Sequence, residues 1–150
     1  MSKTFLLDLT EIQPSQLYIS RAKLAAVRDA WRPPRLATLP PIPVKLLNGR
    51  VIYTDGHTRA FAAYRHGFRQ VPVYWDADDL DWEAYQICVD WCLAVGIRTV
   101  MDLEGRLLPQ QAYEVLWIER CSRMHGTLAA SRASSERTLS GPPAPRPQVT

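Results

Sequence analysis

One stretch constrains this chain more than any other, residues 51–64 with the sequence VIYTDGHTRAFAAY. It begins with β-branched and aromatic residues, passes through Asp55–Gly56, and continues into an alanine-rich run, which predicts a strand, a tight turn and a helix. The beginning of a helix has free backbone N–H groups and partial positive charge, so it favours an anion. His57, Thr58 and Arg59 directly follow the glycine. The segment therefore predicts an anion site at the start of a helix.

The segments on either side of this stretch have patterns typical of strands and helices. Asn48–Gly49 lies between two apolar runs and is the strongest short signal for a β-hairpin in the chain. Ser20 precedes a helical apolar pattern and has the side chain of an N-cap. Strands are expected at residues 5–9, 44–47, 50–54 and 71–75, and helices at residues 20–31, 56–66, 82–95 and 110–124.

These elements predict an α+β fold in which a small mixed sheet carries helices. Residues 1–80 are expected to form this domain, and residues 81–126 a helical extension packed on it. Residues 127–150 are rich in serine, alanine, arginine and proline. Such a composition buries too little apolar area to offset the entropy of ordering the chain, so we expect a disordered tail there.

The charge balance and the cysteine content limit the kinds of partner and compartment. The net charge is +3, but residues 127–150 contribute three arginines and one glutamate, which leaves the rest of the chain nearly neutral. A nearly neutral domain lacks the basic face of non-specific DNA-binding proteins, so nucleic acid is not an expected partner. Three cysteines, no secretory signal and no apolar run of about 18 residues predict a cytoplasmic protein without a membrane span.

Several groups of residues resemble the ParB/sulfiredoxin family. They are the proline-led strand at 41–44, the turn Asp55–Gly56–His57–Thr58–Arg59, Gly67, and the strand Val71–Pro72–Val73. The resemblance implies a ParB/sulfiredoxin-like fold over residues 5–76. A longer similarity, which includes residues 14–20 and 80–85, relates the chain to small bacterial and archaeal ParB-like proteins. The ParB/sulfiredoxin fold also includes a branch of kinases that phosphorylate free serine.

For the site, the resemblance implies that Gly56, His57, Thr58 and Arg59 contact nucleotide phosphate. In sulfiredoxin and in partition ParB proteins the matching glycine–x–x–arginine turn binds such a phosphate. In the free-serine kinases an aspartate at the position of Asp55 and a histidine or arginine in the turn belong to the active site, which makes Asp55 and His57 the candidate catalytic residues. The expected cofactor is ATP or ADP, or else CTP, with Mg²⁺.

The chain departs from each characterised branch of this family. His57 stands where sulfiredoxin has its catalytic cysteine, which disfavours sulfinic-acid reduction. Gln16 stands near the position of the catalytic glutamate of the kinases, and an amide cannot act as a base; Glu11 lies a few residues away. We also expect no helix-turn-helix module and no dimerisation domain of the partition ParB type, because 150 residues leave no room for them.

Each candidate side chain in the turn also has a structural interpretation. The Asp55 carboxylate is a general base or a magnesium ligand, or it caps the helix by accepting from an N–H two or three residues on. His57 transfers a proton near neutral pH, or it is a buried histidine bonded to backbone. Thr58 binds phosphate or simply begins the helix. Arg59 has the planar fork that suits phosphate, or it pairs with an acid such as Asp55.

The polar loop with Ser15, Gln16 and Tyr18 is the second candidate element, which either selects the second substrate or is ordinary turn chemistry. No metal-binding set of side chains is predicted. The aspartates at 76–81 are typical of a solvated turn that also favours the N-terminus of the next helix. Cys88 and Cys92 are typical of buried thiols. The aromatic residues of the last two helices are core, or a homodimer interface if the chain self-associates.

Three functions follow as hypotheses. The first is a nucleotide-dependent phosphotransferase acting on a small hydroxylated metabolite such as serine, since phosphoryl transfer depends mostly on positioning and charge neutralisation. The second is a non-catalytic module for nucleotide sensing or protein interaction. The third, a DNA-associated adaptor like partition ParB, is disfavoured by the nearly neutral charge.

Overall fold

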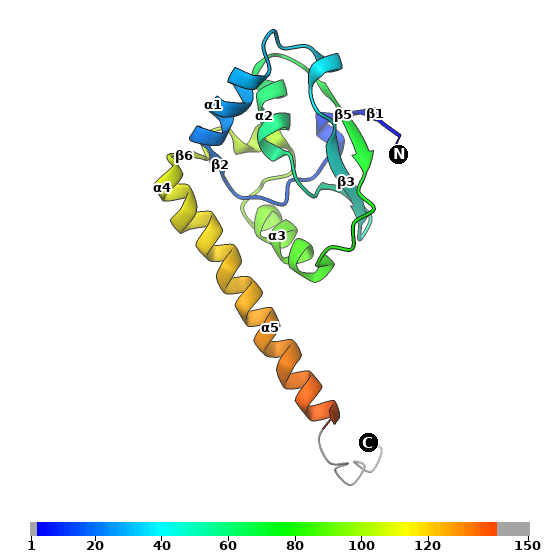
Figure 1. Ribbon diagram of the computed structural model, residues 1–150, viewed down its shortest axis with the longest axis vertical. Coiled ribbons are helices and arrows are strands. Elements are labelled where there is room, and N and C mark those ends of the chain that lie inside the picture. The colour runs from blue at the N-terminus through cyan, green and yellow to red at the C-terminus, as the bar shows by residue number, and fades with distance from the viewer. Residues whose placement is uncertain (1–2, 141–150) are drawn as a thin grey trace.

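The computed structural model describes residues 3–140 and has a mixed α+β fold (Figure 1). The strands are β1 (Phe5–Asp8), β2 (Ile19–Ser20), β3 (Ile42–Leu47), β4 (Arg50–Tyr53), β5 (Gln70–Trp75) and β6 (Leu107–Leu108). The α-helices are α1 (Arg21–Ala30), α2 (His57–Arg65), α3 (Trp82–Ala94), α4 (Gln110–Tyr113) and α5 (Glu119–Ser140). Short 3-10 turns lie at Leu9–Glu11, Leu36–Thr38 and Val100–Leu103, and a π-helical segment at Glu114–Ile118.

The main sheet is mixed, as the sequence predicts, with the strand order β1-β5-β3-β4. β5 is parallel to β3 and antiparallel to β1, and β2 and β6 form a separate small parallel sheet. β3 pairs antiparallel with β4 through a turn at Asn48 and Gly49, whose φ angles are 49° and 81°. Positive φ at both positions is what a two-residue hairpin turn of this kind requires. The predicted hairpin is therefore confirmed.

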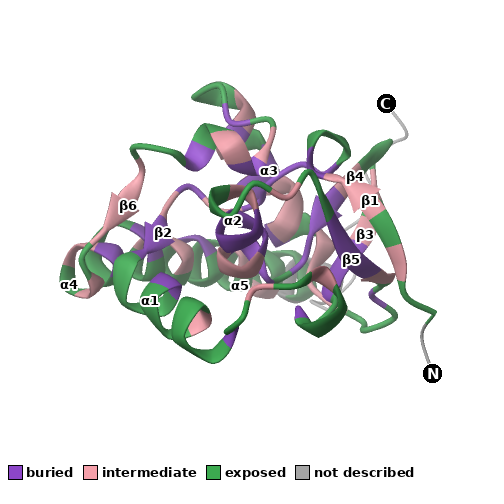
Figure 2. Cartoon of the chain, turned by 90° about the horizontal axis from the view of Figure 1, so that it is seen from above, coloured by how far each residue is buried: buried purple, intermediate pink, exposed green. Residues whose placement is uncertain are grey.

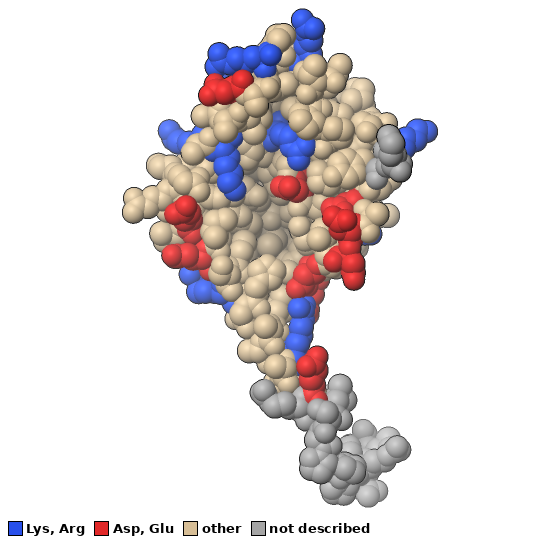
Figure 3. Space-filling model, in the orientation of Figure 1, with Lys and Arg blue, Asp and Glu red and all other residues tan. Residues whose placement is uncertain are grey.

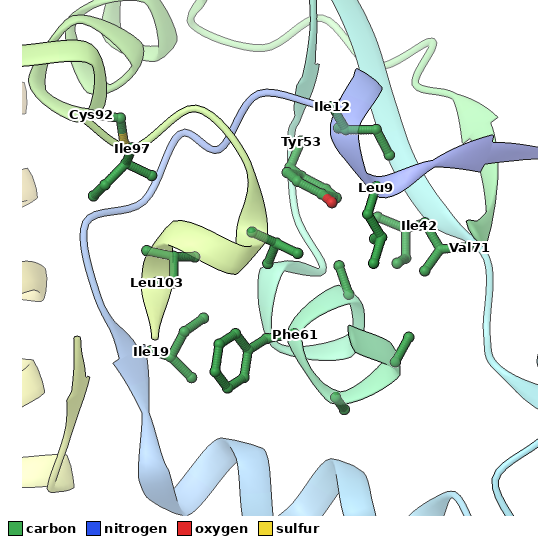
Figure 4. Packing of buried hydrophobic residues seen from close by; sticks show 14 of the residues in the cluster. Leu9, Ile12, Ile19, Ile42, Tyr53, Phe61, Val71, Cys92, Ile97 and Leu103 are labelled. Atoms are coloured by element: carbon green, nitrogen blue, oxygen red, sulfur yellow. The ribbon is translucent and has the colours of Figure 1, made fainter. Parts of the chain in front are cut away.

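Helix α2 lies at the centre of the molecule, beside the main sheet and covered by α1 (Figures 1 and 2). Its residues 60–63 are fully buried, and the Phe61 ring packs near Ile19 and Leu103 (Figure 4). The covering helix α1 begins as predicted, because the Ser20 side chain accepts a hydrogen bond from the Lys23 N–H. Helix α2 is therefore packed between the main sheet and helix α1.

One apolar core runs through both predicted parts of the chain. It joins Val44 and Val71 of the main sheet with Phe61 of α2, and these with Cys92 and Trp117 from the segment beyond residue 80. Helix α3 and the first part of the C-terminal helix are therefore packed on the sheet-bearing part and share its core. Within residues 3–140, no helix has the length and apolar content needed to cross a membrane.

The C-terminal helix is longer than the sequence pattern predicts. Helix α4, the π-helical segment and α5 follow one another directly, and the far end of α5 projects beyond the body (Figure 1). The structure corrects the expectation of a disordered tail from Thr127, since the chain stays helical to Ser140. The segment is rich in alanine, which has high helix propensity, and Arg132 pairs with Asp81 at 2.9 Å. The proline-rich end of the predicted tail, 141–150, lies outside the described residues.

The phenol of Tyr53 is the one buried side-chain polar group without a hydrogen-bond partner in the described residues. Its ring lies among apolar side chains that include Ile12 and Leu9 (Figure 4), and burial raises the pKa of Tyr53 far above its usual range. A buried hydroxyl that makes no hydrogen bond costs about 1–3 kcal/mol. The ring therefore stabilises the core while its hydroxyl weakens it.

Replacing Tyr53 by phenylalanine is expected to leave the protein as stable as before or to stabilise it by about 1 kcal/mol. Chemical denaturation followed by circular dichroism measures the change. Tyr85→Phe is the matched control, because the Tyr85 hydroxyl donates to the Thr54 carbonyl oxygen at 2.7 Å and its removal should cost about 1 kcal/mol. Equal destabilisation by the two substitutions would contradict this account of Tyr53.

Candidate functional site

The turn between β4 and α2 places the predicted site residues at the first turn of a helix. Gly56 is the N-cap residue, with a φ of 78°, and none of the described side chains caps α2. The Asp55 carboxylate accepts a hydrogen bond from the adjacent Gly56 N–H at 2.7 Å, so Asp55 is not the helix cap that one interpretation of the sequence offered. The first backbone N–H groups of α2 and their partial positive charge therefore stay available to a ligand.

Gly56 fits its place because it has no Cβ atom. A Cβ there would lie 2.9 Å from Cγ2 of Ile42 and 3.0 Å from Nη2 of Arg59. Ile42 is fully buried on β3, so its side chain has no room to move away. The glycine thus allows both the sheet and the Arg59 guanidinium to approach the turn closely.

His57 is a buried hydrogen-bond acceptor. The residue is 4% exposed, and its Nε2 accepts from the Ser15 N–H at 2.9 Å. An accepting ring nitrogen carries no proton, so the proton of the neutral imidazole lies on Nδ1. Burial lowers the pKa of His57 to about 4, against a smaller opposing effect of the Asp55 charge. The geometry therefore favours the buried histidine bonded to backbone over a proton carrier at neutral pH.

Arg59 is held by backbone carbonyl groups rather than by an acid. Its Nη1 donates to the carbonyl oxygens of Pro40 and Pro41, at 3.0 and 2.7 Å. Within residues 3–140 no salt bridge joins Arg59 to a carboxylate, so the alternative of a pair with Asp55 is not realised. Its positive charge is uncompensated, and its Nε and Nη2 groups remain for another acceptor.

Arg59 lines the first of two cavities that meet at the turn. This basic cavity, of about 370 Å³, lies between α1, the start of α2 and α4. The four predicted phosphate-binding residues, 56–59, all line it, and so does Lys23 of α1. The Lys23 Nζ lies 5.1 Å from the centre of the Tyr113 ring, which positions the ammonium group. Asp55 is the single acidic side chain among the described residues that line this cavity.

The polar loop before α1 is only partly brought to the site. Ser15 is fixed by His57, as described above. Gln16 lines both cavities, and its Nε2 donates to the Tyr18 carbonyl oxygen at 2.7 Å and to the Tyr113 hydroxyl at 3.0 Å, which leaves Oε1 as its remaining polar atom. Tyr18 lines neither cavity, since its ring packs against an arginine outside them.

The second cavity, of about 350 Å³, lies between α3 and the C-terminal helix, and we call it the α3–α5 cavity. Its lining is mostly apolar and includes Leu80 and Trp117. Gln16, Asp55 and His57 line this cavity as well as the basic one. A ligand in each cavity would therefore come close to Asp55.

Two thiols in the α3–α5 cavity form a pair. Cys88 of α3 and Cys121 of α5 both line this cavity, and their mutual interaction raises the pKa of Cys88 and lowers that of Cys121. Cys88 and Cys92 are buried, as predicted, and Cys121 is partly exposed. Across the described residues, no group of three or more histidine, cysteine or acidic side chains is placed to hold a metal ion.

The acidic segment at 76–81 matches the predicted solvated turn at Asp78 and Asp79, which are exposed, and differs from it at Asp76. Asp76 is buried, and its carboxylate accepts from the Thr54 hydroxyl at 2.6 Å. Asp81 caps α3 by accepting from the Ala84 N–H, and its hydrogen bond with Arg132 lowers the pKa of Asp81 to about 2. On the face drawn in Figure 3, most basic side chains lie on the upper part of the molecule, and acidic side chains lie on both sides of a central hollow.

No protein-family model and no curated protein matches this chain. A solved structure with some similarity is that of protein Atu1540 from Agrobacterium tumefaciens, which is 16% identical in sequence and superposes with a TM-score of 0.49. The match covers 69% of this chain and 62% of that chain, so this chain spans less than two thirds of its length. A likeness at this level does not indicate a function.

Proposed function

We propose that the chain binds the phosphate groups of a nucleotide, ATP, ADP or CTP, in the basic cavity. The proposal depends on one observation, the convergence of the uncapped start of α2, Lys23 and Arg59 on a cavity with a single carboxylate. Two cations and a helix N-terminus attract a polyanion more strongly than one acid repels it. The resemblance of residues 55–59 to nucleotide-phosphate turns supports a nucleotide rather than a simple anion.

The reaction proposed for this site is phosphoryl transfer to a small hydroxylated molecule. Asp55 lies where the two cavities meet, so it can reach a nucleotide in one and an acceptor in the other. The acceptor oxygen attacks the terminal phosphorus, its proton passes to the Asp55 carboxylate, and the bond from that phosphorus to the bridging oxygen breaks. The nucleotide leaves one phosphate shorter. His57 stays neutral, and its role is to hold the Ser15 loop against the turn.

A Mg²⁺ ion would be held here by Asp55 together with the phosphates of the nucleotide. Mg²⁺ commonly takes one or two carboxylates and completes its shell with substrate phosphates and water. The one carboxylate among the described residues of the basic cavity fits such an ion and does not form a metal site without nucleotide. When bound, the ion neutralises phosphate charge.

Isothermal titration with ATP, ADP and CTP tests nucleotide binding. Arg59→Ala and Lys23→Ala should each weaken binding about tenfold or more, because a charge-assisted hydrogen bond contributes about 1.5–3 kcal/mol. Arg28→Ala is the matched control, since Arg28 lies on the same helix as Lys23 and lines a different cavity. Absence of binding by the wild type, or unchanged binding by Arg59→Ala, rejects the site.

Detection of phosphorylated product tests the transfer step. Asp55→Asn should still bind ADP in the absence of Mg²⁺ but lower kcat about 100-fold or more, because it removes both the general base and the carboxylate that would hold Mg²⁺. The assay uses ATP or ADP with serine and a panel of other alcohols. Nucleotide binding without product from any acceptor would instead favour the nucleotide-sensing module.

A further inference from the structure

The lining of the α3–α5 cavity is mostly apolar, which does not suit a ligand as polar as serine. We infer that it binds the apolar or aromatic body of the acceptor substrate and directs the acceptor hydroxyl to Asp55. This inference rests on the proposed phosphoryl transfer and names the class of its acceptor: a small alcohol with an apolar or aromatic body, not a small polar amino acid.

The size and lining of the cavity support an apolar body. Its volume of about 350 Å³ lies at the lower end of the usual range for small-molecule sites, about 300–1,000 Å³. Leu80, Trp117 and Met124 line it together with the ring of Tyr85. Trp117 is packed edge-on against a second tryptophan, with 6.1 Å between ring centres, so its position is fixed. A ligand as small and polar as serine would leave most of this apolar surface uncovered, whereas an aromatic ring would cover it.

The polar groups of the lining indicate which end of the ligand faces inward. Tyr85 already donates its hydroxyl proton to a backbone carbonyl, His57 Nε2 already accepts a backbone N–H, and Asp81 is paired with Arg132. The Asp55 carboxylate accepts only from its neighbour Gly56 among the described residues, so it keeps capacity for a further donor. Of the lining groups shared with the basic cavity, the Asp55 carboxylate and the Gln16 amide oxygen keep this capacity, and the charged carboxylate is the stronger acceptor for a hydroxyl.

Helix α5 forms one wall of the cavity, and contacts of Arg132, which lies further along α5 than the lining residues, hold this wall in place. The Arg132 guanidinium binds the Asp81 carboxylate at 2.9 and 3.0 Å and Glu83 at 2.7 Å. These contacts tie α5 to the start of α3 past the residues that line the cavity, Cys121 and Met124. The cavity is consequently part of the folded structure and does not need a ligand to form.

Amide NMR on the whole chain tests the inference, with benzyl alcohol as the probe and L-serine for comparison. Benzyl alcohol should give saturable shifts at Ala84, Cys88 and Cys121, and L-serine should not. Cys121→Trp fills the cavity and should weaken benzyl alcohol binding about tenfold or more, while the small substitution Cys121→Ser should not. Shifts of the Thr58 and Arg59 amides on adding ADP report the phosphate site in the same spectra and should persist in Cys121→Trp.

Alkylation of the wild type provides a readout that needs no variant. Cys121 is the partly exposed thiol of the cavity, so iodoacetamide should modify it before Cys88 and Cys92. Benzyl alcohol should slow this reaction and L-serine should not. No shift and no protection by benzyl alcohol, or equal protection by L-serine, would overturn the apolar site. Binding of benzyl alcohol without any ADP shift at Thr58 and Arg59 would uphold the apolar site and overturn its role as an acceptor site together with the proposed function.

Discussion

Replacing Gly56 by alanine is expected to lower the free energy of unfolding by about 3 kcal/mol and to abolish nucleotide binding. A φ of 78° costs a residue with a Cβ atom about 1–2 kcal/mol. The new methyl group would also lie 2.9 Å from the buried Ile42 side chain, and overpacking of this kind costs about 1–3 kcal/mol. The same methyl group would lie 3.0 Å from Nη2 of Arg59, so it would also displace the guanidinium of the proposed phosphate site.

Gly49→Ala is the matched control for this substitution. Gly49 has nearly the same φ, 81°, but a Cβ there would meet no atom of the described residues within 4 Å. It should therefore cost only the conformational term, about 1–2 kcal/mol, and leave ADP binding unchanged. Urea denaturation and titration with ADP measure both effects. If Gly56→Ala lowers the free energy of unfolding no more than Gly49→Ala does and still binds ADP, the short contacts of position 56 with Ile42 and Arg59 contribute to neither stability nor binding.

Lowering the pH from about 7 to about 4 is expected to cost the protein about 3 kcal/mol through His57 alone. The pKa of His57 falls from 6.5 to about 4 on folding, mainly because the ring is buried. Between these values the unfolded chain takes up a proton that the folded protein does not, so stability falls with pH. The contribution is complete above pH 6.5 and is lost by the time the pH reaches about 4.

His57→Gln isolates this effect. The glutamine carboxamide keeps an acceptor for the Ser15 N–H but has no titratable group. The difference in unfolding free energy between wild type and variant, measured at several pH values, should change by about 3 kcal/mol across this window. Asp81 does not interfere, because wild type and variant both carry it and its contribution cancels in the difference. A constant difference would mean that the His57 ring is not buried in its neutral form.

The features that could be predicted from the sequence are those whose signals are local. Asn48–Gly49 specifies a hairpin because two adjacent residues adopt positive φ, and Ser20 caps a helix by bonding an N–H three residues on. Residues 56–59 are contiguous and line one cavity together, and phosphate binding by them stays a prediction. The last helix extends beyond its predicted end, because residues 127–140 form a helix while burying little apolar area.

The features that could not be predicted depend on packing between distant segments. Lys23 reaches the basic cavity because α1 packs on α2, and nothing near Lys23 in the sequence indicates this. His57 has the residue type of a proton carrier, but its pKa is decided by burial and by a backbone N–H 42 residues away. The α3–α5 cavity exists only because the C-terminal helix returns past α3, which brings Cys121 to Cys88.

The uninterrupted C-terminal helical rod has a thermodynamic consequence. It contributes Tyr113 to the basic cavity and Trp117, Cys121 and Met124 to the α3–α5 cavity. The Arg132 contacts and the packing of Trp117 hold this rod in one position, and any ligand that shifted it would change the affinity of the other cavity. Linkage then requires reciprocity: whatever factor a nucleotide applies to acceptor binding, the acceptor applies to nucleotide binding.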